Sequence, residues 1–543
     1  MNKINSSLTL KIITLSVLLS PTFTQARWST PDEADAVIDN YEGVITVKAD
    51  GQSDAVMTTD ITILNEQGRE KHGIQRLYHN GNIEKIEILA ATAVHEGKKY
   101  TVPKSMIETK PLASPGGGFD QQYQTVISYP KVSVGTQLHL KYRLKTKKQP
   151  LPKYYSAGHN FGSGALWKMA KITIKSELPL FKAVNDPRQS LTITESNDKK
   201  IQTITLTLDK PLYEHLSNEA SILDPELRTW AEVSTFDKFA DFGNAHAENY
   251  EKVIHEPLPP LLENIKNEAE KCTNPIDQLN KVSSLLAEKV RYMGDWRTVE
   301  GRFTPHSLAE IAKSGVGDCK DFSVAMGAIL LKMGYTAHTV LVTRGEGYLP
   351  NKQALPSVSE YNHAMLKIID KEGKVYWIDP TNLVSMADGI FPDICNRPAL
   401  VLDPDKSILE SIPNIKSNHA MTIHEKTLIL TGSNNGAFNK GDILHTEGIL
   451  TFKGENAAQL TGTTLTNSPQ VIGESLIHGL SKEATPLNHK IDLPDLSSRT
   501  VKDLKITYEF DQENTTFFTN EGKGIQLDSP WSRSYLNAAK DQI

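Results

Sequence analysis

The fold is decided by GVGDCKDFSVAMGAILLKMGYTAHTVLV, residues 315–342 of this 543-residue chain. Apolar side chains recur at helical spacing from Phe322 to Met333, and Gly334 follows at the position where helices commonly end. The next residues, TAHTVLV, have the β-branched and apolar content of a strand. The segment therefore predicts a helix that begins beside Cys319 and leads directly into a sheet.

Two more strands are predicted downstream, at NHAMLKII and VYWID, with a tight turn at 370–372 between them. His363 lies six residues before the end of the first strand, Ile369. Asp379 lies six residues after Gly373, which opens the second strand. A hairpin closed by this turn places His363 opposite Asp379. A shift of one residue would turn one side chain to the other face, so the spacing constrains the pair.

Cys319 occupies the first turn of the predicted helix. Unsatisfied backbone N–H groups and the helix dipole favour a thiolate there, and the neighbouring Lys320 adds positive charge. Gly315 and Gly317 permit a close-packed approach that leaves the sulfur at a cleft. Taken alone, Cys319 is more simply interpreted as a buried, inert cysteine.

The predicted hairpin changes that interpretation. An imidazole beside a carboxylate is held in one tautomer and is stabilised as imidazolium. If the hairpin packs beside the N-terminus of the helix, the base reaches the thiol. We therefore predict a catalytic triad with Cys319 as nucleophile, His363 as general base and Asp379 as orienting carboxylate.

Neither a metal nor a cofactor is expected. The three side chains of the predicted triad are fewer than the four ligands of structural zinc, and the sequence has no CxxC, HExxH or calcium-loop pattern. The glycine run at 116–118 lacks a following helix motif, so phosphate binding is not predicted. His95, His306 and His338 stand isolated, and surface or core positions suffice for them.

Hydrophobic patterns divide the chain into parts. Short alternating apolar runs predict a two-sheet β-sandwich over 27–215. Residues 216–260 are less regular and end in the proline cluster HEPLPP, so they are expected to form a linker region. Helical periodicity capped by Asn274, followed by the strands above, predicts an α+β catalytic domain over 261–400. The β patterns return in 401–543, and the whole is expected to be a multidomain α+β protein with a C-terminal β domain.

The first 26 residues have the features of a signal peptide. Lys3 and Lys11 accompany an apolar run far shorter than the roughly 20 residues of a membrane span, and a small-x-small pattern follows at 24–26. We expect an exported protein, periplasmic or secreted, without an integral membrane segment in the mature chain. Because oxidising compartments favour disulfides, Cys272 with Cys395 is the better candidate pair if any pair is bridged.

Charge limits the range of partners. A nucleic-acid surface requires concentrated Lys and Arg, whereas the formal net charge of this chain is -6. No nucleic-acid partner is therefore predicted. The sequence leaves the oligomeric state open.

Three separated motifs carry a family resemblance. The run at 315–342, YNHAMLKI around His363 and YWIDPTN around Asp379 resemble the transglutaminase-like superfamily, in which Cys, His and Asp occur in this order. The upstream RYMGDWRTVEGRFTPHSLAEIAKSG resembles the segment before the cysteine in bacterial members. Residues 59–212 resemble the domain of unknown function 3857, which such members often carry at the N-terminus.

The resemblance implies a papain-like core whose thiolate attacks an amide carbonyl of a protein or peptide, forms an acyl-enzyme and passes the acyl group to an amine or to water. Cys319 would be the nucleophile, His363 the general acid/base and Asp379 the orienting residue. Transglutamination, deamidation and hydrolysis all stay open. The oxyanion hole would include the backbone N–H of Cys319. Tyr292 and Trp296 are candidates for its second donor, although packing roles suit such aromatics.

One departure from the family bears on function. Animal transglutaminases carry a tryptophan after the cysteine, whereas this chain has Lys320 and Asp321, so neither glutamine–lysine cross-linking nor a calcium requirement is predicted. An alternative function is a non-catalytic binding or scaffolding protein of the cell envelope. In that case the β domains would recognise a partner and the central module would be degenerate or unused.

Overall fold

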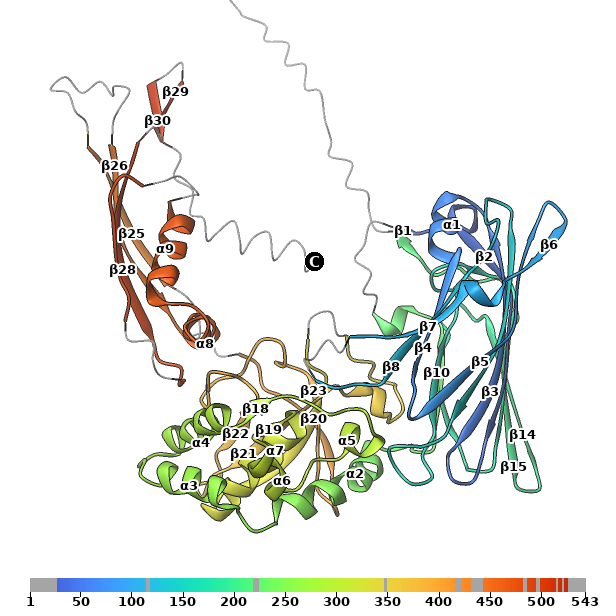
Figure 1. The fold of residues 1–543 in the computed structure, drawn as a ribbon, viewed down its shortest axis with the longest axis horizontal. Helices are drawn as coiled ribbons and strands as arrows, with labels where there is room; N and C mark the ends of the chain where they lie inside the picture. Colours follow the sequence, from blue (N-terminus) through green and yellow to red (C-terminus); the bar gives the residue numbers. More distant parts are fainter. Residues whose placement is uncertain are drawn as a thin grey trace, which may run out of the picture.

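The structure is a computed structural model that describes residues 27–113, 118–217, 224–345, 349–415, 422–430, 443–481, 486–494, 499–513, 516–519 and 522–525. Three parts follow one another along the chain: a large β structure, an α+β part, and a smaller sheet with two helices (Figure 1). The predicted signal peptide, residues 1–26, lies outside the described residues. Within the described ranges, no helix is long and apolar enough to cross a membrane.

The N-terminal part is built on one nine-stranded mixed sheet. In sheet order its strands are β14 (Leu191–Asp198), β15 (Ile201–Leu208), β12 (Ala170–Ser176), β2 (Ala36–Val47), β3 (Ser53–Ile63), β9 (Gln137–Thr146), β5 (Glu84–His95) and β6 (Lys98–Thr101), with β11 (Leu166–Trp167) paired to β2. β11 and β12 run parallel to β2, and the other pairs are antiparallel. Smaller elements are α1 (Glu66–His72) and the pair β1 (Arg27–Trp28) with β16 (Leu216–Ser217).

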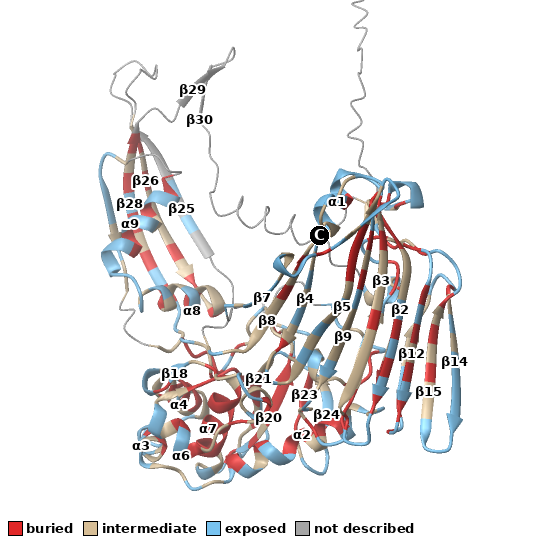
Figure 2. Cartoon of the chain, turned by 45° about the vertical axis from the view of Figure 1, so that its right-hand side comes forward, coloured by how far each residue is buried: buried red, intermediate tan, exposed pale blue. Residues whose placement is uncertain are grey.

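Two three-stranded sheets close the core of this part. They are β4 (Ile74–Asn80), β8 (Gln122–Ser128) and β7 (Ile107–Pro111), and β10 (Ser156–Asn160), β17 (Trp230–Ser234) and β13 (Phe181–Asn185). Buried residues alternate with more exposed ones along β12 and β15 (Figure 2), and Ile172 and Ile204 share one core with Ile127 of β8 and Val233 of β17. The expected two-sheet β-sandwich is thus a large sheet faced by two small ones.

The central part places helices against an antiparallel five-stranded sheet. In sheet order its strands are β22 (Val375–Ile378), β21 (His363–Ile369), β20 (Thr336–Val342), β23 (Pro398–Val401) and β24 (Ile408–Ser411). The helices are α2 (Phe239–Ile254), α3 (Pro260–Ala269), α4 (Pro275–Lys289), α5 (Val299–Phe303), α6 (Leu308–Ser314) and α7 (Cys319–Lys332). The predicted α+β character is confirmed, and the sheet extends past residue 400.

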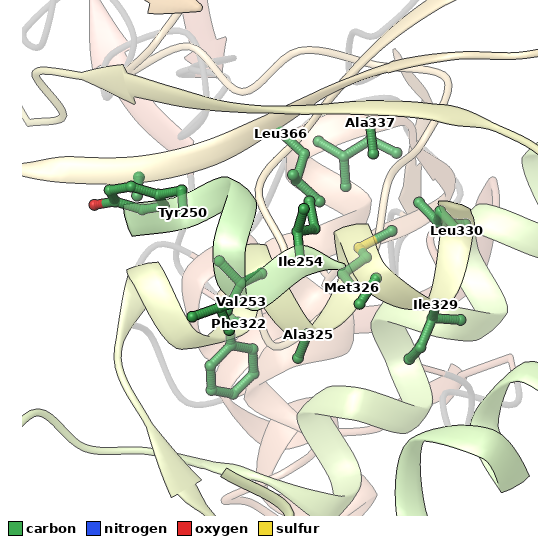
Figure 3. Close-up of a cluster of buried hydrophobic side chains, with 14 of the residues drawn as sticks. Tyr250, Val253, Ile254, Phe322, Ala325, Met326, Ile329, Leu330, Ala337 and Leu366 are labelled. Atoms are coloured by element: carbon green, nitrogen blue, oxygen red, sulfur yellow. The ribbon is translucent and has the colours of Figure 1, made fainter. Parts of the chain in front are cut away.

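Helix α7 forms the centre of the core, as Figure 3 shows. Its residues from Phe322 to Leu330 are all buried, because apolar and small side chains cover nearly every face. It packs against Ile254 of α2 and Leu366 of β21. Gly327 permits the close approach of α7 and α2, since a Cβ there would lie 2.4 Å from Ile254 Cδ1. Each fully buried large aliphatic side chain contributes about 1.5–3 kcal/mol.

The segment expected as a linker, 216–260, is structured. It contributes β17 to the N-terminal part and α2 to the central core. The linker expectation was wrong because acidic and amide residues interrupt the apolar ones along α2. Phe242, Ala247, Tyr250 and Ile254 nevertheless fall on one buried face of the helix.

The β21–β22 hairpin has a register different from the predicted one. Its three-residue loop is 371–373, one position later than expected. Gly373 adopts a φ of 82°, and the Asp370 carboxylate accepts two backbone N–H groups of the turn, which fixes this closure. Each residue of β21 therefore pairs with a residue two positions later than predicted, as Ile369 does with Val375. An even shift preserves the face of every side chain, so His363 and Asp379 remain on one face as diagonal neighbours.

The C-terminal part is not β structure alone. Its antiparallel sheet has the order β25 (Thr422–Leu430), β26 (Ile443–Phe452), β28 (Leu504–Glu513) and β27 (His489–Asp492), and a hairpin follows at β29 (Thr516–Thr519) and β30 (Gly522–Ile525). Helices α8 (Gly454–Thr463) and α9 (Pro469–Leu480) were not expected. Ile477 of α9 packs with Leu450 and Ile506 of the sheet. Ser468 and Pro469 provide the N-cap and first-turn signal for α9.

The segment that leads into β21 is docked on the N-terminal part. The backbone N–H of Leu355 donates to Glu232 at 3.0 Å, and the Ser234 hydroxyl donates to the carbonyl of Pro356 at 2.8 Å. Burial, together with the charge of Glu232, raises the pKa of Glu360 to about 7. The contact between the two parts thus contains a carboxyl group that titrates near neutral pH.

Replacing Glu360 by Gln should stabilise the protein at pH 8 and change little at pH 4. The pKa of Glu360 is about 7 in the folded protein and 4.5 as its ordinary value, so the folded state holds the extra proton between these values. Wild-type stability therefore falls as the pH rises through that window. Thermal unfolding should show a gain of about 3 kcal/mol at pH 8. Ser359→Ala is the control, and an equal effect of Glu360→Gln at both pH values would contradict the prediction.

Candidate active site

Three segments bring the predicted site residues together. Cys319 is the first residue of α7, His363 is the first residue of β21, and Asp379 directly follows β22. Cys319 and His363 line the same cleft, and His363 Nε2 lies 2.7 Å from Asp379 Oδ2. The structure thus assembles the Cys, His and Asp that the sequence singled out.

Reciprocal capping holds the helix start that presents Cys319. The Asp318 carboxylate accepts the backbone N–H of Lys320 at 3.0 Å, and the Asp318 N–H donates to Asp321 at 3.0 Å. His306, which seemed isolated in the sequence, donates its backbone N–H to Asp321 and lies 3.0 Å from it through Nδ1. The first turn of α7 is therefore tied to the preceding loop.

The Asp318 carboxylate is also the partner of two groups beside the nucleophile. Trp296 Nε1 donates to Asp318 Oδ2 at 2.7 Å, and the Lys320 ammonium pairs with the same oxygen. Burial lowers the pKa of Lys320, but the negative charges of Asp318 and Cys319 raise it by more. The net pKa is therefore raised above its ordinary value, and the ammonium stays charged. The positive charge expected next to Cys319 is present, but it is held in a buried ion pair.

Asp379 is almost fully buried and accepts four hydrogen bonds. Besides His363, its donors are the backbone N–H and hydroxyl of Thr381, at 2.9 and 2.6 Å, and Nη1 of Arg344. Arg344 reaches it from the end of β20 and also contacts Asp393 through Nε. Sequence reasoning missed Arg344, because nothing in its local pattern distinguishes it from a solvent-exposed arginine after a strand.

The protonation states of the pair follow from these contacts. Burial by itself would raise the pKa of Asp379 and lower that of His363. Mutual attraction acts the other way, aided by Arg344 at the carboxylate and by Cys319 at the imidazole. The net effect holds the pKa of Asp379 well below its usual range and raises the pKa of His363 to about 10. At neutral pH the imidazolium of His363 therefore lines the same cleft as Cys319.

A cleft of about 930 Å³ opens beside Cys319, a size typical of sites for organic ligands. Phe242 and Tyr361 give it an aromatic side, with ring centroids 6.4 Å apart. The lining residues are Asp120, Phe242, His246, Tyr250, Tyr292, Trp296, Arg302, Phe303, Cys319, Lys320, Leu341, Arg344, Gly345, Val358, Ser359, Tyr361, Asn362, His363, Ala364 and Asp393.

The N-terminal part supplies one wall of this cleft. Asp120 forms an ion pair with Arg302 at 2.5 Å, and both line the cleft. The backbone N–H of Phe119 donates to Gly294 at 2.7 Å, and the N–H of Trp296 donates back to Phe119 at 2.7 Å. These contacts fix the loop that carries Trp296. No local sequence pattern predicts these contacts, because they join residues far apart in the chain.

The remaining candidate site residues are the cysteines and the side chains that could bind a metal ion. All three cysteines lie within the described residues, and each is a free thiol, so Cys272 and Cys395 are not bridged. Across the described part of the chain, no group of three or more His, Cys, Asp and Glu side chains is arranged to hold a metal ion.

Comparison with a family model identifies the N-terminal part. Residues 49–212 match the family described as a domain of unknown function with a solved structure, DUF3857. The predicted resemblance to this domain is confirmed, although the match begins at residue 49 and not at 59. No curated protein matches the sequence.

Solved structures extend the likeness to most of the chain. A protein named "putative protease" from Parabacteroides distasonis is similar over 93% of this chain and 97% of its own, with a TM-score of 0.56 and 12% identity. This likeness shows a shared fold. A zinc metallopeptidase of the M1 type from Deinococcus radiodurans covers 37% of this chain and 42% of its own, at 12% identity and a TM-score of 0.19, which is too low for a shared fold.

Replacing Asp379 by Asn should lower the pKa of His363 from about 10 to below its ordinary value, because burial persists while the carboxylate is lost. The imidazolium would then be largely absent at pH 7. Iodoacetamide labelling of Cys319 at pH 7, well below the ordinary thiol pKa of about 8.5, should slow at least about tenfold. Asp388→Asn, at an exposed position, is the matched control. Unchanged labelling in Asp379→Asn would contradict the assignment of the pair.

Proposed function

We propose that this chain is an exported, transglutaminase-like cysteine enzyme that acts on amide bonds of proteins or peptides through a thioester acyl-enzyme. One observation carries the proposal. Cys319 starts a buried helix and shares a cleft with His363, which is held by Asp379 at 2.7 Å. The shared fold with a protein named "putative protease" supports a peptide substrate.

The geometry is suited to acyl transfer in two steps. The Cys319 thiolate attacks the amide carbonyl carbon, and the electron pair of the C=O bond moves to oxygen. His363 then donates its proton to the amine nitrogen, which leaves as the C–N bond breaks and the thioester forms. In the second step neutral His363 takes a proton from water or an amine, which attacks the thioester and releases the thiolate. Asp379 stays ionised and orients the imidazole throughout.

The identity of the acceptor decides the reaction. Water gives hydrolysis of a peptide bond or deamidation of a glutamine side chain, and an amine gives transamidation. Lys320 stands where animal transglutaminases have a tryptophan, so the site gives no preference for glutamine–lysine cross-linking. Export to the periplasm or beyond is part of the proposal and rests on the features of residues 1–26.

The alternative, a non-catalytic scaffold of the cell envelope, explains the site less well. A scaffold gains no stability from a buried carboxylate paired with an imidazolium beside a free thiol, because well-packed apolar side chains in place of a buried ion pair are often equally or more stabilising.

Labelling of Cys319 with iodoacetamide tests the nucleophile without a known substrate. In the wild type, Cys319 should be labelled at pH 6 at least about tenfold faster than Cys272 and Cys395, as measured by mass spectrometry of the corresponding peptides. His363→Ala should remove that advantage and leave the other two cysteines unchanged. Equal rates at all three cysteines in the wild type would reject the enzyme and favour the scaffold.

The acceptor is tested with casein as a general protein substrate and a fluorescent cadaverine as amine. Transfer predicts fluorescent casein, and hydrolysis predicts new peptide N-termini. Deamidation predicts ammonia released in the absence of the amine, because transfer from glutamine to the amine also releases ammonia. Each product should fall at least about 10³-fold in Cys319→Ser, because the alcohol is a far weaker nucleophile. A product that persists in Cys319→Ser does not come from this site.

A further inference from the structure

Two of the groups beside the nucleophile are engaged with the same carboxylate. The indole N–H of Trp296 donates to Asp318 at 2.7 Å, and the ammonium of Lys320 pairs with the same oxygen. Asp318 is buried and caps α7, so releasing either group would leave a buried charge with fewer partners. In both side chains a donor is therefore already committed to Asp318.

Tyr292 is placed differently. It ends β18 (Arg291–Tyr292), which pairs in parallel with β19 (Val316–Gly317), so that Tyr292 lies opposite Gly317. Its ring lies against Phe322 in the first turn of α7, with centroids 6.1 Å apart. Tyr292 lines the cleft together with Cys319, and its hydroxyl interacts with the side chain of Cys319. The β18–β19 pair therefore carries a phenol into the cleft beside Cys319.

The phenol keeps its proton. Burial raises the pKa of Tyr292 above its usual value, and the charges of Cys319 and Asp318 raise it further. The hydroxyl is thus a hydrogen-bond donor throughout the neutral range. A donor that contacts the nucleophile is also close to the atom that the nucleophile attacks, since the carbonyl carbon and oxygen are only about 1.2 Å apart.

We propose that the Tyr292 hydroxyl is the second donor of the oxyanion hole, together with the backbone N–H of Cys319. This inference rests on the proposed function. When Cys319 attacks, negative charge moves from sulfur to the carbonyl oxygen, and the hydroxyl donates a hydrogen bond to the oxyanion. The interaction then strengthens in the transition state, which is the condition for a contribution to rate.

An aldehyde tests this without a known substrate. The Cys319 thiol adds to N-acetylphenylalaninal, whose aromatic side chain matches the aromatic side of the cleft. The C–S bond forms, the C=O electron pair moves to oxygen, and the thiol proton completes the hemithioacetal, whose oxygen occupies the oxyanion position. Protection of Cys319 from iodoacetamide gives the affinity for the aldehyde, and labelling without aldehyde reports the nucleophile alone.

Tyr292→Phe retains the ring and should fold. We expect its affinity for the aldehyde to fall at least tenfold, while the labelling rate without aldehyde stays within threefold of wild type. A merely structural role would lower both. Tyr335→Phe, which removes a buried hydroxyl that donates to Gln278 outside the cleft, is the matched control and should change neither quantity.

Unchanged aldehyde affinity in Tyr292→Phe would overturn the assignment. So would a larger loss in Trp296→Phe than in Tyr292→Phe, which would identify the indole as the donor. If wild-type Cys319 is neither labelled faster than the other cysteines nor protected by the aldehyde, the proposed function itself fails and the assignment of Tyr292 fails with it.

Discussion

The negative charge buried at Asp379 is the constraint on which the rest of the site depends. An isolated charge in that position would destabilise the fold by several kcal/mol. Its partners come from three places: His363 at the start of β21, Thr381 just beyond the aspartate, and Arg344 after β20. The charge is compensated only when these strands are paired and the loops beyond them are closed. The raised pKa of His363 therefore depends on the formation of the sheet.

The cleft depends in the same way on the N-terminal part. The loop with Trp296 is held by Phe119, and Asp120 pairs with Arg302 inside the cleft. The segment leading to His363 is held by β17, where Glu232 accepts the N–H of Leu355. Both flanks of the nucleophile are thus positioned by residues 118–120 and 230–234. The part that matches DUF3857 continues up to the wall of the site and is more than a neighbouring module.

Local signals in the sequence were sufficient to predict the helix and the hairpin that carry Cys319, His363 and Asp379, and insufficient for the elements around them. The α7 pattern and the order of Cys319, His363 and Asp379 predicted the helix start and the hairpin, and a two-residue error in register did no harm because side-chain direction repeats every two residues. The linker over 216–260 was wrong because the apolar face of α2 is interrupted by polar residues and is completed only by α7. Arg344 was not predictable, because its partner Asp379 is distant in sequence.

The lysine that follows Cys319 depends on the residue that precedes Cys319. Lys320 is buried and needs a carboxylate partner, and Asp318 provides it while also capping α7. The same carboxylate takes the indole N–H of Trp296, so one buried charge occupies two of the donors nearest to Cys319. Tyr292, carried by a two-residue strand, lines the same cleft as Cys319. Because Asp318 caps α7, pairs with Lys320 and accepts the indole N–H of Trp296, the helix start and the polar side chains around Cys319 depend on one buried carboxylate.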